Sequence, residues 1–200
     1  MGKKSREERE QKRESYAEKR TRAKRKFALI AGSLLAGVAI VVGITGYWFY
    51  QNTFTAPDAP PGAGTLGDEH EHAAIKVILF GDEFDFSSQA FQIKNRYIHF
   101  EGNNGETIHR HASGVSLGFL FDTLNIGLID ECYIFPDKRE FCTNEDYSLK
   151  FYINHQQVPG LRDFVLEDGD RILISYGNEN STQVEEQLAR VDAVFIQRSG

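Results

Sequence analysis

An uncharged apolar run of twenty-four residues dominates the N-terminal part of the chain. It extends from Phe27 to Tyr50 and contains no Asp, Glu, Lys, Arg or His. At about 1.5 Å per residue, a helix of this length measures about 36 Å, which exceeds the ~30 Å hydrocarbon layer of a bilayer. The run is longer than the apolar core of a signal peptide and ends in four aromatic residues typical of a membrane–water interface. The sequence therefore predicts a single transmembrane helix over residues 27–50.

Charge is divided unevenly between the two sides of this span. Residues 1–26 hold twelve Lys or Arg and five Glu, a net charge of +7, whereas the rest holds eleven Lys or Arg and twenty-four Asp or Glu, a net −13. A basic flank stays in the cytoplasm, which predicts a cytoplasmic segment 1–26 in the cell membrane and an extracytoplasmic part after Tyr50. The basic flank suits anionic membrane lipid. The acidic remainder repels phosphate, which excludes nucleic acid as a main partner.

A segment rich in proline and glycine follows the span. Residues 51–67 contain three Pro and three Gly, a composition that predicts a partly stiff linker without helix or strand. The 133 residues from 68 to 200 are enough for one hydrophobic core. The expected organisation is therefore a basic segment, a transmembrane helix, a linker over 51–67 and one outer domain over 68–200.

Strand and helix patterns alternate within the outer domain. Apolar residues at positions i, i+3, i+4 and i+7 predict a helix from Leu117, with Ser116 as its N-cap. A last helix is expected over 182–196, where Thr182 and Glu185 form a capping box. Strands are expected at residues 73–80, 84–86, 97–101, 107–111, 132–135, 149–154 and 171–176. This order predicts an α+β domain, a mixed sheet with one central helix on one face.

Two His-x-His pairs are the main candidates for a metal site. His70 with His72, and His109 with His111, each place two imidazoles on one side of a strand, because alternate strand residues face the same way. Imidazole suits Cu(II) and Zn(II), so the sequence predicts a copper or zinc site. No dedicated general base accompanies the pairs, which favours metal binding or delivery over catalysis. The alternative is that these histidines are half-exposed strand residues without a metal.

His99 has two possible positions relative to these pairs. A three- or five-residue loop between the strands at 97–101 and 107–111 puts it on the face of His109 and His111. A two- or four-residue loop, such as a tight turn at Asn104-Gly105, puts it on the opposite face. His99 is therefore a conditional fifth ligand.

The two cysteines, Cys132 and Cys142, belong to the part expected to face an oxidising compartment. Nine residues separate them, and a structural disulfide is predicted. Dithiol oxidoreductases carry C-x-x-C at a helix N-terminus, a spacing that this sequence lacks. A thiol–disulfide oxidoreductase or isomerase that uses both cysteines as catalytic residues is nevertheless an alternative, since Lys138 and Arg139 lie nearby and can lower a thiol pKa.

Two further features concern modification and partners. Asn180-Ser181-Thr182 is an N-glycosylation sequon, which makes Asn180 a candidate acceptor. The span contains small residues at four-residue spacing that would let another helix approach closely, namely Ser33, Gly37, Ala39 and Gly43. A third functional hypothesis is therefore a structural accessory subunit of a membrane or extracytoplasmic protein complex.

Several phrases resemble known proteins. The segment Ser148–Gly177, with its DGD phrase before a final apolar strand, resembles the closing strands of ubiquitin-like β-grasp domains. The layout is also similar to small archaeal membrane-anchored proteins with an H-x-H-A start, here at His70, an I-H-x-H-A-x-G-V phrase, here at Ile108, and a DGDRILI-type ending, here at Asp168. Some of those proteins are labelled protein-disulfide isomerases. The resemblance implies a β-grasp outer domain and, through that label, isomerase activity.

Overall fold

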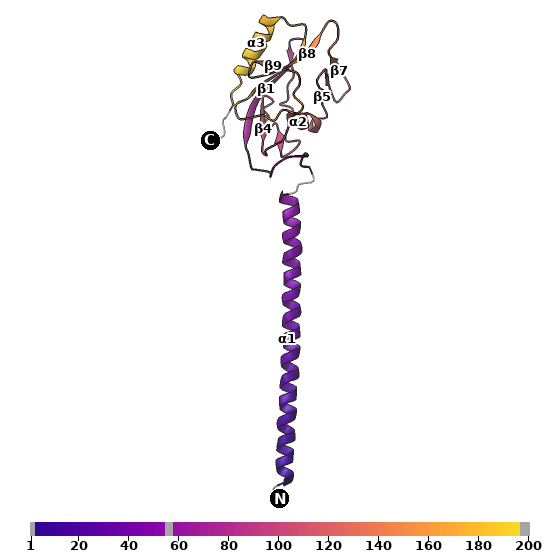
Figure 1. The fold of residues 1–200 in the computed structure, drawn as a ribbon, viewed down its shortest axis with the longest axis vertical. Coiled ribbons are helices and arrows are strands. Elements are labelled where there is room, and N and C mark those ends of the chain that lie inside the picture. Colours follow the sequence, from indigo (N-terminus) through magenta and orange to yellow (C-terminus); the bar gives the residue numbers. More distant parts are fainter. Residues whose placement is uncertain (1–2, 55–57, 197–200) are drawn as a thin grey trace. The chain divides into compact units, whose positions relative to one another are not determined.

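The structure is a computed structural model that describes residues 3–54 and 58–196. Its contacts divide the chain into two compact units, residues 1–53 and 54–200. Residues 3–53 of the first unit belong to one continuous helix, α1 (Lys3–Phe54) (Figure 1). All residues from Phe27 to Tyr50 are exposed except Ala31, which is half-buried. The helix is long and apolar enough to cross a membrane.

The segment predicted as a linker is shorter than expected at both ends. Helix α1 continues through Phe54, whereas residues 55–57 lie outside the described residues. From residue 58 the chain already belongs to the outer unit: the backbone N–H of Gly64 donates to the Ser113 carbonyl at 2.8 Å. A Cβ at Gly64 would meet the ends of the Asp68 and Ser113 side chains, so this segment lies close to both residues. The predicted domain start at Asp68 is therefore too late.

The outer unit contains a mixed sheet, as predicted. Its strand order is β3-β4-β1-β10-β8-β9, with β2 also paired to β1. The central strands β1 and β10 are parallel, and the other pairs are antiparallel. The strands are β1 (Glu71–Leu79), β2 (Asp82–Glu83), β3 (Ile98–His99), β4 (Thr107–Arg110), β8 (Ser148–Ile153), β9 (Gln156–Val158) and β10 (Arg171–Gly177). A second sheet contains β5 (Gly127–Ile129), β6 (Cys132–Ile134) and β7 (Glu140–Cys142).

Two helices pack on opposite faces of the large sheet (Figure 1). Ile75 of β1 belongs to the main core together with Leu120 of α2 (Leu117–Thr123), which Ser116 caps as predicted. Ala74, the next residue before Ile75, packs instead with Leu188 of α3 (Ser181–Asp192). Successive strand residues point to opposite faces, so α2 and α3 cover different sides. His72 lies two residues before Ala74 in β1, so its side chain is on the α3 side of the sheet. The other histidines discussed below share this side.

The capping box of α3 differs from the prediction. Asn180, rather than Thr182, is the N-cap, and its side chain accepts the N–H of Gln183 while the Gln183 side chain accepts the N–H of Asn180. The helix ends at Asp192 rather than at residue 196. Asn is as good an N-cap as Thr or better, and Gln at the third position serves as Glu does, so the upstream pair forms the box.

The two cysteines form a disulfide, as the sequence predicted. Cys132 of β6 and Cys142 of β7 lie directly opposite each other in the antiparallel register of the small sheet. The hydroxyl of Tyr176 in β10 donates to the Cys142 carbonyl at 3.0 Å, which connects this sheet to the large one. The disulfide thus links the two strands of a hairpin, and the Tyr176 hydrogen bond connects one end of this hairpin to the large sheet.

Replacing both cysteines by alanine is expected to destabilise the protein by about 3 kcal/mol. The closed loop has a sequence separation of 10, and cross-linking a loop of this size removes about that much chain entropy from the unfolded state. Urea unfolding of the oxidised wild type and the Cys132→Ala/Cys142→Ala variant measures the difference. A change below about 0.5 kcal/mol would show that the bridge has no structural role.

Candidate metal centre

The strand register places three histidines in one row across the sheet. His109 of β4 lies opposite His72 of β1 on one side and opposite His99 of β3 on the other. Directly opposed residues of an antiparallel pair share a face. Residues 100–106 form the connection between β3 and β4, an odd number, so His99 takes the position expected for an odd loop. His99 therefore joins the face of the His-x-His pairs.

His70 and His111 complete a cluster of five imidazoles. The ring centroid of His70 lies 4.6 Å from that of His72 and 4.6 Å from that of His111. His72 and His109 are also 4.6 Å apart, and His99 is 5.0 Å from His111. We call these five residues the histidine cluster. The structure thus brings together all five histidines that the sequence singled out, from the entry to β1 and from both strands of the hairpin.

Three members of the cluster have the spacing of a metal site. One ligand atom each of His70, His72 and His109 lies within 4.8 Å of the other two. The side chain of His70 is exposed, that of His72 is buried and that of His109 is half-buried. The triad therefore has a protected side within the sheet and an open side that solvent or a further ligand can reach, the arrangement of a three-histidine site with a free position.

One buried ring nitrogen of the cluster has no hydrogen-bond partner among the described residues. Nδ1 of His109 is buried and makes no hydrogen bond within the described residues; Oε1 of Glu101 is 3.6 Å away. Buried polar atoms normally have a partner, so this nitrogen is suited to a ligand. Nδ1 of His99 lies 2.7 Å from the Asn95 carbonyl, which can only accept, so Nδ1 is the donor in this hydrogen bond.

The turn before β10 positions His72. The backbone N–H of His72 donates to Oδ1 of Asp168 at 3.1 Å, and the N–H of Gly169 donates to the His72 carbonyl at 2.8 Å. The same Asp168 oxygen is 3.6 Å from Nδ1 of His72. A carboxylate beside one ring nitrogen orients the imidazole and raises the basicity of the other nitrogen toward a metal. The DGD phrase was assigned only a structural role from the sequence, so this contact was missed.

An acidic groove adjoins the triad on the side of Asp168. Its lining includes the carboxylates of Glu69, Glu71, Glu167 and Asp168. Arg110 is the basic residue in this lining; it is buried and forms an ion pair with Glu69. The groove consequently carries a negative potential that concentrates cations close to the histidines. Arg110 follows His109 in the sequence, yet nothing in the sequence indicates that its side chain is buried.

Burial keeps two imidazoles of the cluster neutral. Burial, with the smaller effects of the neighbouring histidines, lowers the pKa of His109 to about 4 against the opposing effect of the Glu101 carboxylate. Burial likewise lowers the pKa of His111 to about 4, with His99 and His70 acting in the same direction. Neutral imidazole is the form that binds a metal ion. At pH 7 no proton has to leave either ring before coordination.

The metal-free protein is expected to lose about 3 kcal/mol of stability between pH 7.5 and pH 5. His109 and His111 have a folded-state pKa near 4, below the unfolded value of 6.5, so the folded state binds fewer protons. The stabilisation is complete above pH 6.5 and is lost as the pH falls toward 4; the figure allows for partial exposure. Urea unfolding in EDTA measures it. The His109→Gln/His111→Gln variant should give a flatter profile, and an equally steep one would contradict the assignment.

The other candidate residues lie away from the cluster. Cys132 is in strand β6, not at a helix N-terminus, and is bonded to Cys142. Asn180 is exposed, and its Oδ1 caps α3, whereas glycosylation takes place at Nδ2, so modification at Asn180 stays a prediction. The sixth histidine, His155, lies in a turn where its Nε2 is 2.9 Å from Oδ2 of Asp192.

Comparison with protein-family models, with curated proteins and with solved structures gives no match for this chain. The candidate metal centre is therefore supported by its own geometry: the register that gathers five imidazoles, the triad with ligand atoms in range, and the buried nitrogen of His109 without a hydrogen bond.

Proposed function

We propose that this protein is a single-pass membrane protein whose outer domain binds Cu(II) or Zn(II), in a binding or delivery role. The observation that carries the proposal is the convergence of ligand atoms from His70, His72 and His109 within 4.8 Å. The donor set favours these ions over Cu(I), which prefers sulfur ligands. The one methionine is Met1, and the described residues include no free cysteine, so imidazole and carboxylate are the ligands on offer.

Metal titration of the full-length protein in detergent tests this proposal. The protein is first stripped with EDTA, and Zn(II) and Cu(II) are then added in separate titrations followed by calorimetry. We expect a dissociation constant below about 1 μM for at least one of the two ions. The matched control is His155→Gln, which removes the histidine outside the cluster and should bind as the wild type does. Millimolar or absent binding of both ions would refute the proposal.

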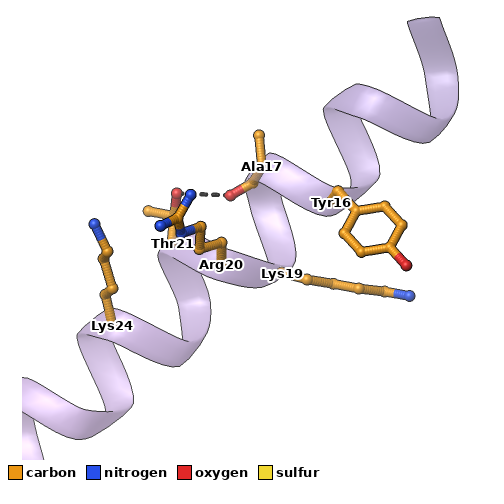
Figure 2. Close-up of a pocket in the computed structure, with 6 residues that line it drawn as sticks. All are labelled: Tyr16, Ala17, Lys19, Arg20, Thr21 and Lys24. Atoms are coloured by element: carbon orange, nitrogen blue, oxygen red, sulfur yellow. Dashed lines mark hydrogen bonds between the residues drawn. The ribbon is translucent and has the colours of Figure 1, made fainter. Parts of the chain in front are cut away.

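The membrane part of the proposal rests on α1. Figure 2 shows Tyr16, Lys19, Arg20 and Lys24 extending from neighbouring turns of this helix, N-terminal to the apolar stretch. The hydroxyl of Thr21 donates to the Ala17 carbonyl at 2.8 Å, so this hydroxyl is satisfied within the helix. The lysine and arginine side chains project from a single helix, which suits contact with anionic lipid headgroups at the cytoplasmic surface.

Cysteine labelling in intact cells tests the proposed orientation. The native cysteines are joined in a disulfide, so an introduced cysteine is the reactive thiol. We expect Asp163→Cys, in an exposed loop of the outer unit, to react with a membrane-impermeant maleimide in intact cells. Ser15→Cys, in the basic part of α1, should react only after permeabilisation. The reverse pattern would place the outer unit in the cytoplasm.

We also propose that the outer unit is a β-grasp domain related to the archaeal membrane-anchored proteins that its phrases resemble. What supports the fold is the strand order: the parallel pair β1 and β10 lies between β4 and β8, each antiparallel to its neighbour, with α2 connecting the two halves in sequence. Helix α3 and the sheet of β5, β6 and β7 would then be additions to that core.

A further inference from the structure

Ile93 is an exposed hydrophobic residue of the outer unit in a strained backbone conformation. It lies in the turn before β3, with a φ of 48° and 65% of its surface exposed. A β-branched residue is rarely found at positive φ, and such strain persists where the surroundings impose it, often at functional sites. Phe80 also combines exposure with positive φ, but its ring packs against Tyr147 and Tyr176. Packing of this kind does not explain Ile93, since most of its surface is open to solvent.

Two buried polar side chains hold this turn. Gln92 donates from Nε2 to the Phe86 carbonyl at 2.8 Å and accepts the backbone N–H of Asn103 at 3.0 Å. The side chain of Asn95 accepts the backbone N–H of Tyr97 at 2.8 Å. Gln92 and Asn95 are each 9% exposed. The turn is therefore ordered before it meets a partner, which lowers the entropy that a contact of the residues between them would cost.

Basic side chains accompany Ile93 in the turn. Lys94 and Arg96 are exposed, although the chain after residue 26 carries a net charge of −13. Arg96 pairs with Asp58 at 3.3 Å, but both side chains are largely open to solvent, and such pairs are weak. An apolar side chain beside two cations suits the surface of an anionic bilayer. There, apolar groups enter the boundary of the acyl chains, and Lys and Arg contact the headgroups.

The same turn holds the segment through which the chain enters the outer unit from α1. Asn95 donates from Nδ2 to the Asp58 carbonyl at 3.2 Å, and Arg96 pairs with the Asp58 carboxylate. Helix α1 ends at Phe54, and the four peptide steps to Asp58 span at most about 14 Å. Tyr50, the last residue of the apolar stretch, is about 6 Å back along the helix. Asp58 is thus within about 20 Å of the end of the membrane-spanning stretch, which keeps the turn bound to it near the lipid.

We propose that Ile93, Lys94 and Arg96 form a membrane-contact loop on the outer unit. Ile93 enters the interface of the bilayer that α1 spans, and Lys94 and Arg96 bind the anionic headgroups of that bilayer. This inference rests on the membrane anchoring in the proposed function and is independent of metal binding. The contact holds the acidic outer unit at the membrane surface by one defined turn.

Spin-label accessibility in vesicles tests the membrane-contact loop. The full-length protein with Ile93→Cys is labelled with a nitroxide at the new thiol, because the native cysteines are joined in a disulfide. It is reconstituted into vesicles of phosphatidylcholine alone, or of phosphatidylcholine and phosphatidylglycerol in equal amounts. A neutral nickel chelate, present on both sides of the membrane, should reach the label at least about three-fold less in the anionic vesicles. Oxygen, which concentrates among the acyl chains, should reach it more.

Two further variants make the test specific. Glu145→Cys, labelled in the same way, lies at an exposed position between β7 and β8 and is the matched control. Its accessibility should be equal in the two kinds of vesicle. Adding Lys94→Gln/Arg96→Gln to Ile93→Cys should abolish the difference at position 93, because the charges that attract the headgroups are gone. Circular dichroism confirms that each variant is folded.

The outcomes separate this inference from the proposed function. Equal accessibility at position 93 in both kinds of vesicle overturns the membrane contact and leaves this surface to a protein partner. A fall of the same size at position 145, or one that survives Lys94→Gln/Arg96→Gln, overturns it as well. Protein that does not float with the vesicles overturns the membrane anchoring itself, whereas the metal titration described above decides the metal-binding role separately.

Discussion

Replacing His70 by Gln is expected to lower the affinity of the triad for Zn(II) by at least about 100-fold, with little change in the stability of the metal-free protein. His70 is exposed, so its side chain adds little to the core, yet one of its ring nitrogens lies within 4.8 Å of ligand atoms on His72 and His109. Loss of an outer-shell partner already costs about 10–100-fold in metal affinity, and loss of a direct ligand should cost more. Titration of the stripped protein measures the change.

Stability and affinity together distinguish a ligand from a structural residue. Surface substitutions usually change the free energy of unfolding by less than about 0.5 kcal/mol, and His70→Gln should fall in that range in EDTA. In saturating Zn(II) the wild type should gain stability that the variant lacks, because an ion bound only to the folded state stabilises it. The control His155→Gln should match the wild type in both conditions. Equal Zn(II) affinity in His70→Gln and wild type would remove His70 from the site.

The sequence indicated much of the fold because its strands and helices have strong local patterns. The β-branched run of β1, the apolar spacing of α2 and its Ser116 cap all agree with the packing observed. The errors occurred where two local signals competed or where distant contacts decide. Asn180 and Thr182 are both good N-caps. The choice between them depends on which side chain, three residues after the cap, accepts a hydrogen bond from the backbone N–H of the cap. The packing of residues 58–67 depends on Ser113 and His111, which no local pattern reveals.

The part of the candidate site that follows from the alternation of side chains along a strand could be predicted from the sequence. The His-x-His pairs indicate which residues share a face, but the length of the connection before β4 decides whether His99 joins them, and a one-residue change would reverse its side. Neither Glu101 nor Asp168 could be identified from the sequence as a neighbour of the imidazoles. The position of Glu101 depends on that same register. Asp168 is brought to His72 from ninety-six residues away, by the turn before β10.

Replacing Arg110 by Met is expected to destabilise the protein by about 3 kcal/mol, although its neighbours in sequence are the histidines of the cluster. Arg110 is 3% exposed. Its Nε donates to the Leu166 carbonyl at 3.0 Å, and its Nη1 donates to the Ala112 carbonyl at 2.6 Å and to the Glu69 carboxylate. Met replaces the packing but none of these donors. Two carbonyls would lose a charged donor, and a buried acceptor without a partner costs about 1–3 kcal/mol.

The same substitution should also weaken Zn(II) binding, because the contacts of Arg110 hold segments that carry the site. Glu69 precedes His70, Ala112 follows His111, and Leu166 belongs to the loop that continues to Asp168. Arg110→Lys keeps the charge but offers a single donor group, so it should recover part of the stability only. Arg190→Met, at an exposed position of α3, is the control and should change the free energy of unfolding by less than about 0.5 kcal/mol. If urea unfolding gives equal values for Arg110→Met and Arg190→Met, the guanidinium does not hold these segments, and the framework of the site must lie in the strand register alone.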